Sequence, residues 1–424
     1  MKKRINTRNI RFRILHFIYF VKRQTSNVNI TPQRSRFTFH VSIPAFTSMK
    51  IIIAPDKFKG SLTSLQVCQA IADGIKQADG SARLFLFPMA DGGDGFAAVM
   101  KYYLETNSVN CLTLDPLERK IQASYEWNTK TKTAIIEMAV ASGLVLLKQE
   151  ERDPLKTSTY GTGLLINDAI DKGAKKIILG LGGSATNDAG TGILSALGFQ
   201  FKDSNNNSLK ACGENLLQIE KIIAPPKIPD TKFEIACDVQ NVLYGPQGAA
   251  YVYAPQKGAN NDAVKLLDEG LNHFAEILKR QTGQDVAKVE GTGAAGGVAA
   301  GLMGFFEVEL KKGIDLIIDA SAIKKEVEGT DLLITGEGKI DAQTLEGKVV
   351  RRLSLLAAEH KIPVAAFCGV EDAGNSIIDQ LGLEFIESLV SSSITKEEAM
   401  VNAGELLTNK ANQFFKKHFS NRLD

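Results

Sequence analysis

The glycine-rich stretch from Gly180 to Gly192 constrains the fold of this chain more than any other feature. A short apolar run at 177–179 precedes the stretch, and a plausible short helix at 193–197 follows it. Glycine lets backbone N–H groups approach an anion closely, and the N-terminus of a helix adds a positive dipole. The order of strand, glycine turn and helix therefore predicts an α/β fold in which the turn binds a phosphate.

The same stretch admits a second interpretation, since Gly180, Gly182 and Ala185 have the G-x-G-x-x-A spacing of a dinucleotide-binding turn. Asp203 follows at about the distance of the acidic residue that binds the ribose in such folds. Asp188 opposes this interpretation, because its charge in the first helical turn would repel a pyrophosphate. A structural connection that binds no ligand is a third interpretation, and the stretch alone leaves all three open.

The charge of the chain is unevenly distributed. Residues 1–48 hold ten Lys or Arg and no Asp or Glu, so the rest of the chain carries 40 basic and 48 acidic side chains. A mildly acidic body gives no support to nucleic-acid binding. No apolar run reaches the roughly 18 residues that a membrane-spanning helix needs, so we expect no membrane partner. The sequence does not specify an oligomeric state.

The five cysteines are scattered along the chain and form no C-x-x-C pair. This pattern argues against a disulfide framework and against a zinc site, and it suits a reducing compartment. We therefore expect a cytoplasmic protein.

Changes in texture along the chain predict its domains. Met49 opens a buried strand, so we expect residues 1–48 to be a basic extension that does not fold with the body. Strand–helix units fill 49–112 and 290–424, which predicts one discontinuous, Rossmann-like α/β domain. Between them, 113–289 opens with short alternating segments typical of a β-meander, which predicts an inserted α/β domain with a mixed sheet.

Charged side chains follow the first two predicted strands of the discontinuous domain, where α/β proteins bind their ligands. Lys57 and Lys59 follow the first strand and could bind a phosphate or a carboxylate; solvated loop lysines are the alternative. Asp91 and Asp94 follow the second strand, among three glycines. Hard Mg²⁺ takes one or two carboxylates together with substrate phosphates, so this pair predicts a cation site. A turn with helix caps is the alternative.

The last part of the chain repeats this pattern. Strands are predicted at 314–318 and 332–334, with a helix at 320–327 between them. The later strand leads into Thr-Gly-Glu-Gly-Lys-Ile-Asp at 335–341, and Asp238 likewise ends a predicted strand. The pattern G-x-x-x-x-G-K-[ST] occurs nowhere, which excludes a P-loop protein.

Four segments together resemble the bacterial glycerate kinases of the first type. They are Ala-Pro-Asp-Lys-Phe-Lys-Gly-Ser-Leu at 54–62, Met-Ala-Asp-Gly-Gly-Asp-Gly at 89–95, Gly-Leu-Gly-Gly-Ser-Ala-Thr-Asn-Asp at 180–188, and the segment at 335–341. The resemblance runs from Met49 to near the C-terminus. It implies ATP-dependent phosphorylation of D-glycerate, usually at the 2-hydroxyl, with Mg²⁺. It also implies two α/β domains, one of them discontinuous, with the site in the cleft between them.

Phosphoryl transfer needs positioning, cations on the transferred group and an acceptor for the hydroxyl proton. No His occurs in the four segments, so a carboxylate is the natural base, and Asp188 beside the glycine turn is our first choice. We expect Lys57 and Lys59 to neutralise the substrate carboxylate or the ATP phosphates. The expected Mg²⁺ ligands are Asp91, Asp94, Glu337 and Asp341, and the expected ATP-binding residues are Gly182, Gly183, Ser184, Gly336, Gly338 and Lys339.

Three alternatives stay open at this point: phosphorylation at the 3-hydroxyl, an NAD-dependent oxidoreductase that uses 180–185, and a non-catalytic sensor of a small acid. Carboxylates at the ends of several strands favour the kinase over the oxidoreductase, because a phosphoryl-transfer site needs a base and ligands for Mg²⁺.

Overall fold

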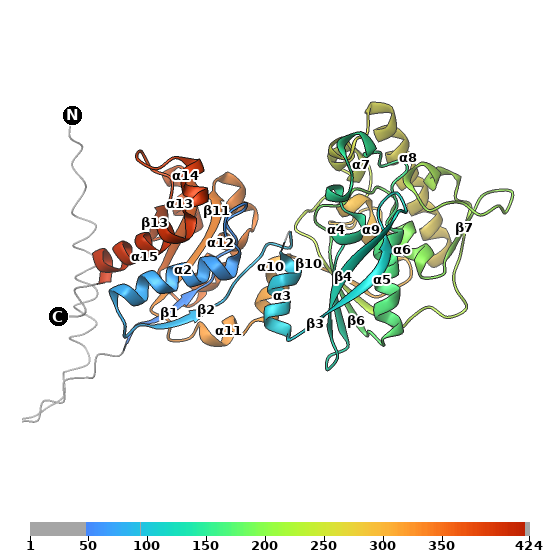
Figure 1. The fold of residues 1–424 in the computed structure, drawn as a ribbon. Coiled ribbons are helices and arrows are strands. Elements are labelled where there is room, and N and C mark those ends of the chain that lie inside the picture. The colour runs from blue at the N-terminus through green and yellow to red at the C-terminus, as the bar shows by residue number, and fades with distance from the viewer. Residues whose placement is uncertain (1–47, 94, 420–424) are drawn as a thin grey trace, which may run out of the picture. The chain divides into compact units, whose positions relative to one another are not determined.

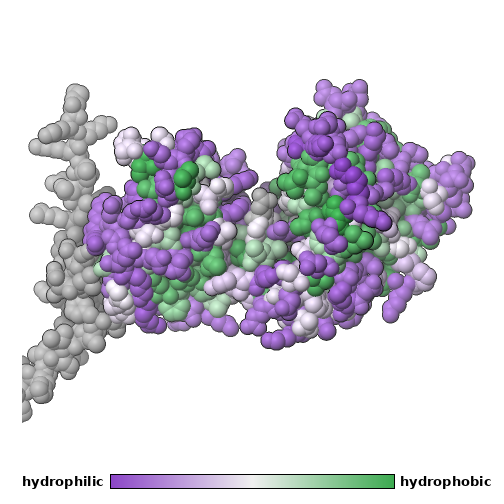
Figure 2. Space-filling view, in the orientation of Figure 1, coloured by the Kyte–Doolittle hydropathy of each residue, from purple (hydrophilic) through white to green (hydrophobic). Residues whose placement is uncertain are grey.

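The structure, a computed structural model, describes residues 48–93 and 95–419. These residues form one compact unit, and apart from Ser48 the predicted N-terminal extension lies outside them. Figure 1 shows the unit as mixed helices and strands, which confirms the predicted α/β class. Within the described residues no helix is long and apolar enough to cross a membrane. Hydrophilic residues cover much of the face shown in Figure 2.

Five parallel strands form the first sheet. Their order is β13 (Phe385–Ser388), β12 (Val364–Glu371), β11 (Leu332–Ile340), β1 (Lys50–Ile53) and β2 (Arg83–Leu86). The two central strands are short apolar runs that pair with Ile52 opposite Leu333, as expected for strands buried on both faces. Because the strands are parallel, the residues that follow β1 and β2 lie at the same end of the sheet as the second half of β11.

Helices cover both faces of the first sheet, since successive side chains of a strand point to opposite sides. Ile51 and Ile53 pack on one side with α2 (Ser64–Ala78), α14 (Lys396–Val401) and α15 (Ala403–Phe419). Ile52 packs on the other side. That side is covered by α3 (Phe96–Leu104), α10 (Gly313–Ala320), α11 (Ile323–Glu326), α12 (Val349–Glu359) and α13 (Asn375–Leu381).

The second sheet is mixed and has six strands. Their order is β10 (Val308–Lys311), β9 (Lys232–Ala236), β6 (Lys176–Gly180), β5 (Thr133–Glu137), β4 (Lys120–Asn128) and β3 (Asn107–Leu114). The first four are parallel, and β4 and β3 continue as the antiparallel meander that the alternating segments predict. The strands of this sheet span 107 to 311, a wider range than 113–289, and the division into domains stays a prediction.

One face of the second sheet packs on helices that follow its strands. These are α4 (Ala139–Ser142), α5 (Tyr160–Asp171), α6 (Thr191–Ala196), α7 (Ala249–Tyr253), α8 (Asn261–Thr282) and α9 (Val298–Met303). The other face shares a core with the first sheet, because Ile135, Ile178 and Ala236 belong to the same cluster as Ile52. Smaller elements are β7 (Gln200–Lys202), β8 (Lys221–Ile223) and the 3-10 turns Leu144–Leu146, Gln149–Glu151, Gly213–Gln218, Pro255–Lys257, Ala294–Gly296 and Ala342–Glu346.

The helix α10 corrects a prediction, since its residues include the run 314–318 that was expected to be a strand. Ile314, Leu316, Ile317 and Ile318 are all buried in the core that the two sheets share. The two polar residues of the helix, Asp315 and Asp319, lie four positions apart on its exposed side, and in so short an apolar run this spacing is hard to tell from that of a buried strand. The predicted helix at 320–327 is reduced to the single turn of α11.

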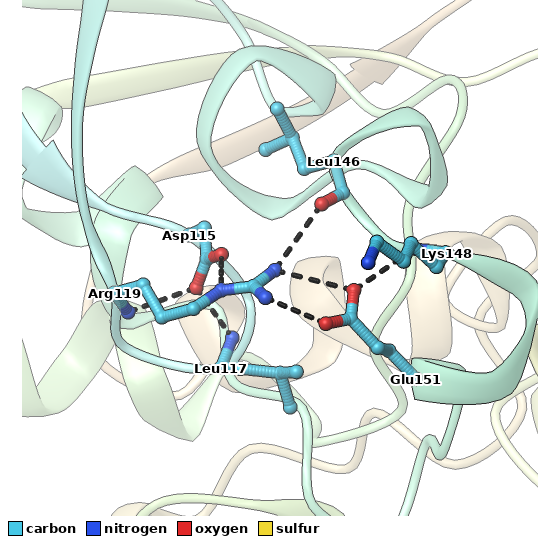
Figure 3. Close-up of polar contacts among 6 residues, drawn as sticks. All are labelled: Asp115, Leu117, Arg119, Leu146, Lys148 and Glu151. Atoms are coloured by element: carbon cyan, nitrogen blue, oxygen red, sulfur yellow. Dashed lines mark hydrogen bonds and ion pairs between the residues drawn. The ribbon is translucent and has the colours of Figure 1, made fainter.

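A polar network fixes the segment that follows β5 (Figure 3). The guanidinium of Arg119 donates to Asp115, to Glu151 and to the carbonyl oxygen of Leu146. The backbone N–H of Lys148 donates to Glu151 at 3.0 Å. These contacts tie the turn after β3 to the two 3-10 turns at 144–151, whose first residue, Leu144, lines the cavity described below.

Candidate active site

Four carboxylates converge where strands of the two sheets end. Asp56 follows β1, Asp91 follows β2, Asp238 follows β9, and Glu337 lies in β11. Asp91 is close enough to raise the pKa of each of the other three by charge repulsion. Gly313 at the start of α10 lies so close to Gly92 that a Cβ on it would stand 2.3 Å from the Gly92 Cα. This close contact brings the Asp91 loop to Asp238.

Burial and mutual repulsion favour the protonated form of three of these groups. Burial, then the charge of Asp91, raises the pKa of Asp56 to about 7. Burial also raises the pKa of Glu337 to about 7, although Glu337 accepts a hydrogen bond from the Thr344 hydroxyl at 2.5 Å. The pKa of Asp238 also rises to about 6, again chiefly because protein atoms surround the carboxyl group. Solvent still reaches this side chain from the cavity. A nearby cation would relieve the repulsion.

A cavity of about 420 Å³, within the usual range for small-molecule sites, opens beside this cluster. Asp91 and Asp238 line one part of it. Gly182 and Gly183 line another part and are exposed to solvent. Lys257 also lines the cavity, so one space brings together carboxylates, a glycine turn and a cation.

The glycine stretch differs in local structure from the expected phosphate loop. After β6 the chain turns at Gly182 and Gly183, and Ser184 pairs with Gly143 in an isolated bridge. The helix α6 begins only at Thr191 and has six residues. The dinucleotide-binding turn needs a helix that starts at the glycines themselves, so the structure lacks the geometry of the NAD-binding alternative.

Asp188 lies beneath the glycine turn, with 0% of its surface exposed. Its Oδ2 accepts hydrogen bonds from the Thr159 backbone N–H and hydroxyl, both at 2.8 Å, and from the Gly192 N–H at 3.2 Å. Its Oδ1 accepts from the Gly190 N–H at 3.1 Å. Burial raises the pKa of this carboxyl, and the four donors oppose that rise. The side chain ties the loop to the start of α5 and does not line the cavity.

The predicted lysines lie in different places. Lys57 is half-buried and lines a second, largely apolar cavity of about 380 Å³ with Asp56, whose Oδ1 accepts from the Lys57 N–H at 2.6 Å. Lys59 is exposed and lines a small third cavity with Gly338. Lys339 is exposed and forms ion pairs with Asp341 at 3.1 Å and Asp372 at 2.7 Å.

The segment 335–341 lies on a strand and not on a loop, since β11 continues to Ile340 beside β12. Gly336 is buried there, and its carbonyl oxygen accepts from the Asp56 N–H at 2.8 Å. A Cβ on Gly336 would stand 2.1 Å from the carbonyl oxygen of Phe367. The structure thus gives Gly336 a packing reason for being glycine. ATP binding by Gly336, Gly338 and Lys339 stays a prediction.

The expected Mg²⁺ ligands are partly brought together. Asp91 and Asp341 both act electrostatically on Glu337, whereas Asp94 lies outside the described residues. Among the described residues, no three His, Cys, Asp or Glu side chains are close enough to hold a metal ion. Mg²⁺ typically uses one or two carboxylates and completes its shell with phosphate and water oxygens. The neighbouring carboxylates Asp91 and Glu337, which repel one another, could supply these one or two ligands.

Sequence reasoning gave no site role to Lys257, which follows the loop residues Ala254-Pro255-Gln256. Nothing in that segment marks the lysine as buried, and only the fold brings it to the glycine turn. Asp56 and Asp238 were recognisable as polar residues at strand ends, but the approach of Asp238 to the Asp91 loop depends on α10, which was predicted as a strand.

The chain is similar to several known proteins. The chain matches the Glycerate kinase family over residues 51–418. It is 41% identical to a glycerate kinase of Halalkalibacterium halodurans, over 85% of this chain and 96% of that protein. It is 40% identical to a glycerate 2-kinase of Escherichia coli, over 84% and 94%. A crystal structure described as that of a candidate glycerate kinase 2 from Salmonella typhimurium LT2 matches with a TM-score of 0.79. Its sequence identity is 36%, and the match covers 89% of this chain and 100% of that one. This chain is therefore a kinase that belongs to the glycerate kinase family.

Proposed function

We propose that the chain transfers the terminal phosphoryl group of ATP to the 2-hydroxyl of D-glycerate. One observation carries the proposal: the carboxylate Asp238 and the cation Lys257 line the same cavity, beside the exposed glycines Gly182 and Gly183. Phosphoryl transfer needs these parts, namely a proton acceptor, a positive charge and backbone that can approach phosphate oxygens. The name of the Escherichia coli relative, a glycerate 2-kinase, supports the 2-hydroxyl as acceptor.

We assign the role of proton acceptor to Asp238 in preference to Asp188. A general base must reach the proton that it removes, directly or through one water. Asp238 is open to solvent in the cavity, whereas the two oxygens of Asp188 already accept four hydrogen bonds in a fully buried position. The raised pKa of Asp238, about 6, also suits a base that works near neutral pH.

The chain's own residues would position the two substrates. The exposed turn at Gly182 and Gly183 allows backbone contact with phosphate oxygens, and Ser184 beside it adds a hydroxyl. Lys57 beside Asp56 is our proposed partner for an anionic group of either substrate. Asp91 and Glu337 are the proposed Mg²⁺ ligands, with Asp94 and Asp341 as further candidates. Bound Mg²⁺ would neutralise charge on the phosphate oxygens.

Release of ADP tests the proposal most simply. We expect release with ATP, Mg²⁺ and D-glycerate, and much slower release with L-glycerate or with glycerol, which lacks the carboxylate. Equal rates with and without any acceptor would contradict the proposal, because they would reveal only ATP hydrolysis. The variant Asp238→Asn serves as the control for a contaminating kinase, since it should lose the D-glycerate-dependent rate.

A further inference from the structure

Lys257 is a buried cation at the edge of an open cavity. Only 2% of its surface is exposed, and it lies in the 3-10 turn Pro255–Lys257 that precedes α8. Its Nζ donates to the Ser184 hydroxyl at 3.0 Å and to the Thr186 carbonyl oxygen at 2.6 Å. An ammonium group has three hydrogens to donate, so these two bonds do not use its full capacity.

The charge of Lys257 lacks a direct counterion within the described part of the chain. No Asp or Glu oxygen of the described residues lies within 4.0 Å of its Nζ. Asp188 acts on it only at a distance, and the Asp188 oxygens already bind Thr159, Gly190 and Gly192. Burial lowers the pKa of Lys257 to about 7. A buried ammonium group is costly without an anion, so an anion in the adjoining cavity would stabilise it.

The other residues of the cavity indicate which anion this is. Asp91 and Asp238 repel anions, so a negative group enters only where Lys257 and the glycine turn compensate, or together with a cation. The transferred phosphoryl group must lie close both to the base and to a positive charge. A substrate carboxylate takes no part in the transfer and does not have to lie close to the base. We infer that Lys257, held in place by Ser184, binds the terminal phosphate of ATP and stabilises the charge on the transferred phosphoryl group; the inference rests on the proposed function.

The 2-hydroxyl oxygen of D-glycerate bonds to the terminal phosphorus while its proton passes to Asp238. The bond from that phosphorus to the oxygen bridging the last two phosphates breaks, and ADP leaves with the electron pair. Lys257 keeps its proton throughout and donates a hydrogen bond to an oxygen of the phosphoryl group. Its role is electrostatic, as for the donors that stabilise developing charge in other enzymes.

The variant Lys257→Met tests the inference, because it keeps the length of the side chain and removes the charge. We expect kcat to fall by about 10²- to 10³-fold, the range for losing one such donor, with little change in KM for D-glycerate. Calorimetric titration without acceptor should show weaker binding of ATP and Mg²⁺ but unchanged binding of ADP and Mg²⁺, since ADP lacks the terminal phosphate. Lys265→Met, at an exposed position of α8, is the matched control and should behave as wild type.

Several results would overturn the inference. One is a raised KM for D-glycerate with unchanged ATP binding, which would assign Lys257 to the substrate carboxylate. Another is a lower melting temperature with unchanged kinetics, which would make the lysine purely structural. If Lys257→Met does not fold, Ser184→Ala decides, because it keeps the lysine but removes its hydroxyl partner; unchanged preference for ATP over ADP would then contradict the inference. A wild type without D-glycerate-dependent ADP release would refute the proposed function instead, and ATP and ADP titrations would still report on Lys257.

Discussion

The backbone N–H of Gly313 donates a hydrogen bond to Oδ1 of Asp238 at 3.1 Å. Gly313 is the first residue of α10, and Asp238 follows β9. The start of this helix therefore orients a carboxylate that lines the cavity. The bond favours the charged form of Asp238, while burial and the charge of Asp91 disfavour it. This balance leaves the group able to gain and lose a proton near neutral pH.

Replacing Asp238 by Asn should lower kcat by about 10²- to 10⁴-fold, the range for losing a general base. The asparagine keeps the shape and can still accept from Gly313, so the melting temperature should change little. In wild type, kcat/KM for D-glycerate should fall below about pH 6, because burial raises the pKa of Asp238 to about 6 in the free enzyme and the protonated group cannot accept a proton. The pH–rate profile of both proteins checks this: a variant with the same acid limb would contradict the assignment.

Replacing Asp188 by Asn should lower the stability of the fold. An amide cannot accept at the nitrogen that replaces one carboxylate oxygen, so hydrogen bonds from Thr159 or Gly190 are lost in a fully buried place. We expect a loss of about 2–4 kcal/mol in the free energy of unfolding, with kcat of the folded enzyme within about tenfold of wild type. Urea denaturation and steady-state rates measure both quantities. A stable variant with kcat reduced by about 10²-fold or more would restore Asp188 as the base.

Lys257 should make stability depend on pH. Burial lowers its pKa to about 7, below that of an unfolded lysine. Between those two pKa values the unfolded chain holds the proton and the folded chain does not, so stability rises with pH by about 1.4 kcal/mol per unit. The difference between wild type and Lys257→Met in urea unfolding at pH 7 and pH 9 isolates this contribution, because the other groups titrate alike in both. A pH-independent difference would show that the folded and unfolded pKa values agree.

Gly336→Ala distinguishes a packing role from a phosphate-binding role. The added methyl group would lie 2.1 Å from the Phe367 carbonyl oxygen, so the paired strands β11 and β12 must separate. We expect a loss of about 1–3 kcal/mol in stability. Gly374→Ala is the control, since a methyl group there meets no described atom within 4 Å. An equally stable Gly336→Ala enzyme with weakened ATP binding would favour the phosphate role.

Activity should require a divalent cation, because the carboxylates around Asp91 otherwise repel the phosphates. Excess EDTA should abolish turnover, and added Mg²⁺ should restore it. Asp91→Asn should raise the Mg²⁺ concentration needed for half-maximal rate. Full activity in excess EDTA would show that turnover does not require a divalent cation.

The sequence was most informative where local pattern and tertiary structure agree. The strand β1 and the meander β3–β5 were predictable, because their residues are short apolar or alternating runs. The identity of α10 was not, since the run 314–318 contains one polar residue, Asp315, and is too short to show the helical spacing that Asp315 and Asp319 have in the structure. The extension of β11 through Gly336 was missed because glycines usually mark a loop, whereas here they permit close strand pairing.

The site was predictable only in part for the same reason. Asp91 and Glu337 stood out beside glycines at strand ends, and both belong to the carboxylate cluster. The burial of Asp188 depends on Thr159, which lies just before α5 and precedes Asp188 by 29 positions. The approach of Lys257 to Ser184 joins residues 73 positions apart. Contacts of that range have no local signal, so no spacing rule could reveal them.

Proton-coupled phosphorus NMR of the product shows directly whether this kinase phosphorylates the 2-hydroxyl of D-glycerate, as we propose. Phosphate on the 2-oxygen couples to the single hydrogen on its carbon and gives a doublet. Phosphate on the 3-oxygen couples to two hydrogens and gives a triplet. We expect the doublet, formed in proportion to the ATP consumed and much reduced with Asp238→Asn. A triplet would assign the 3-hydroxyl, and inorganic phosphate as the sole product would contradict the claim altogether.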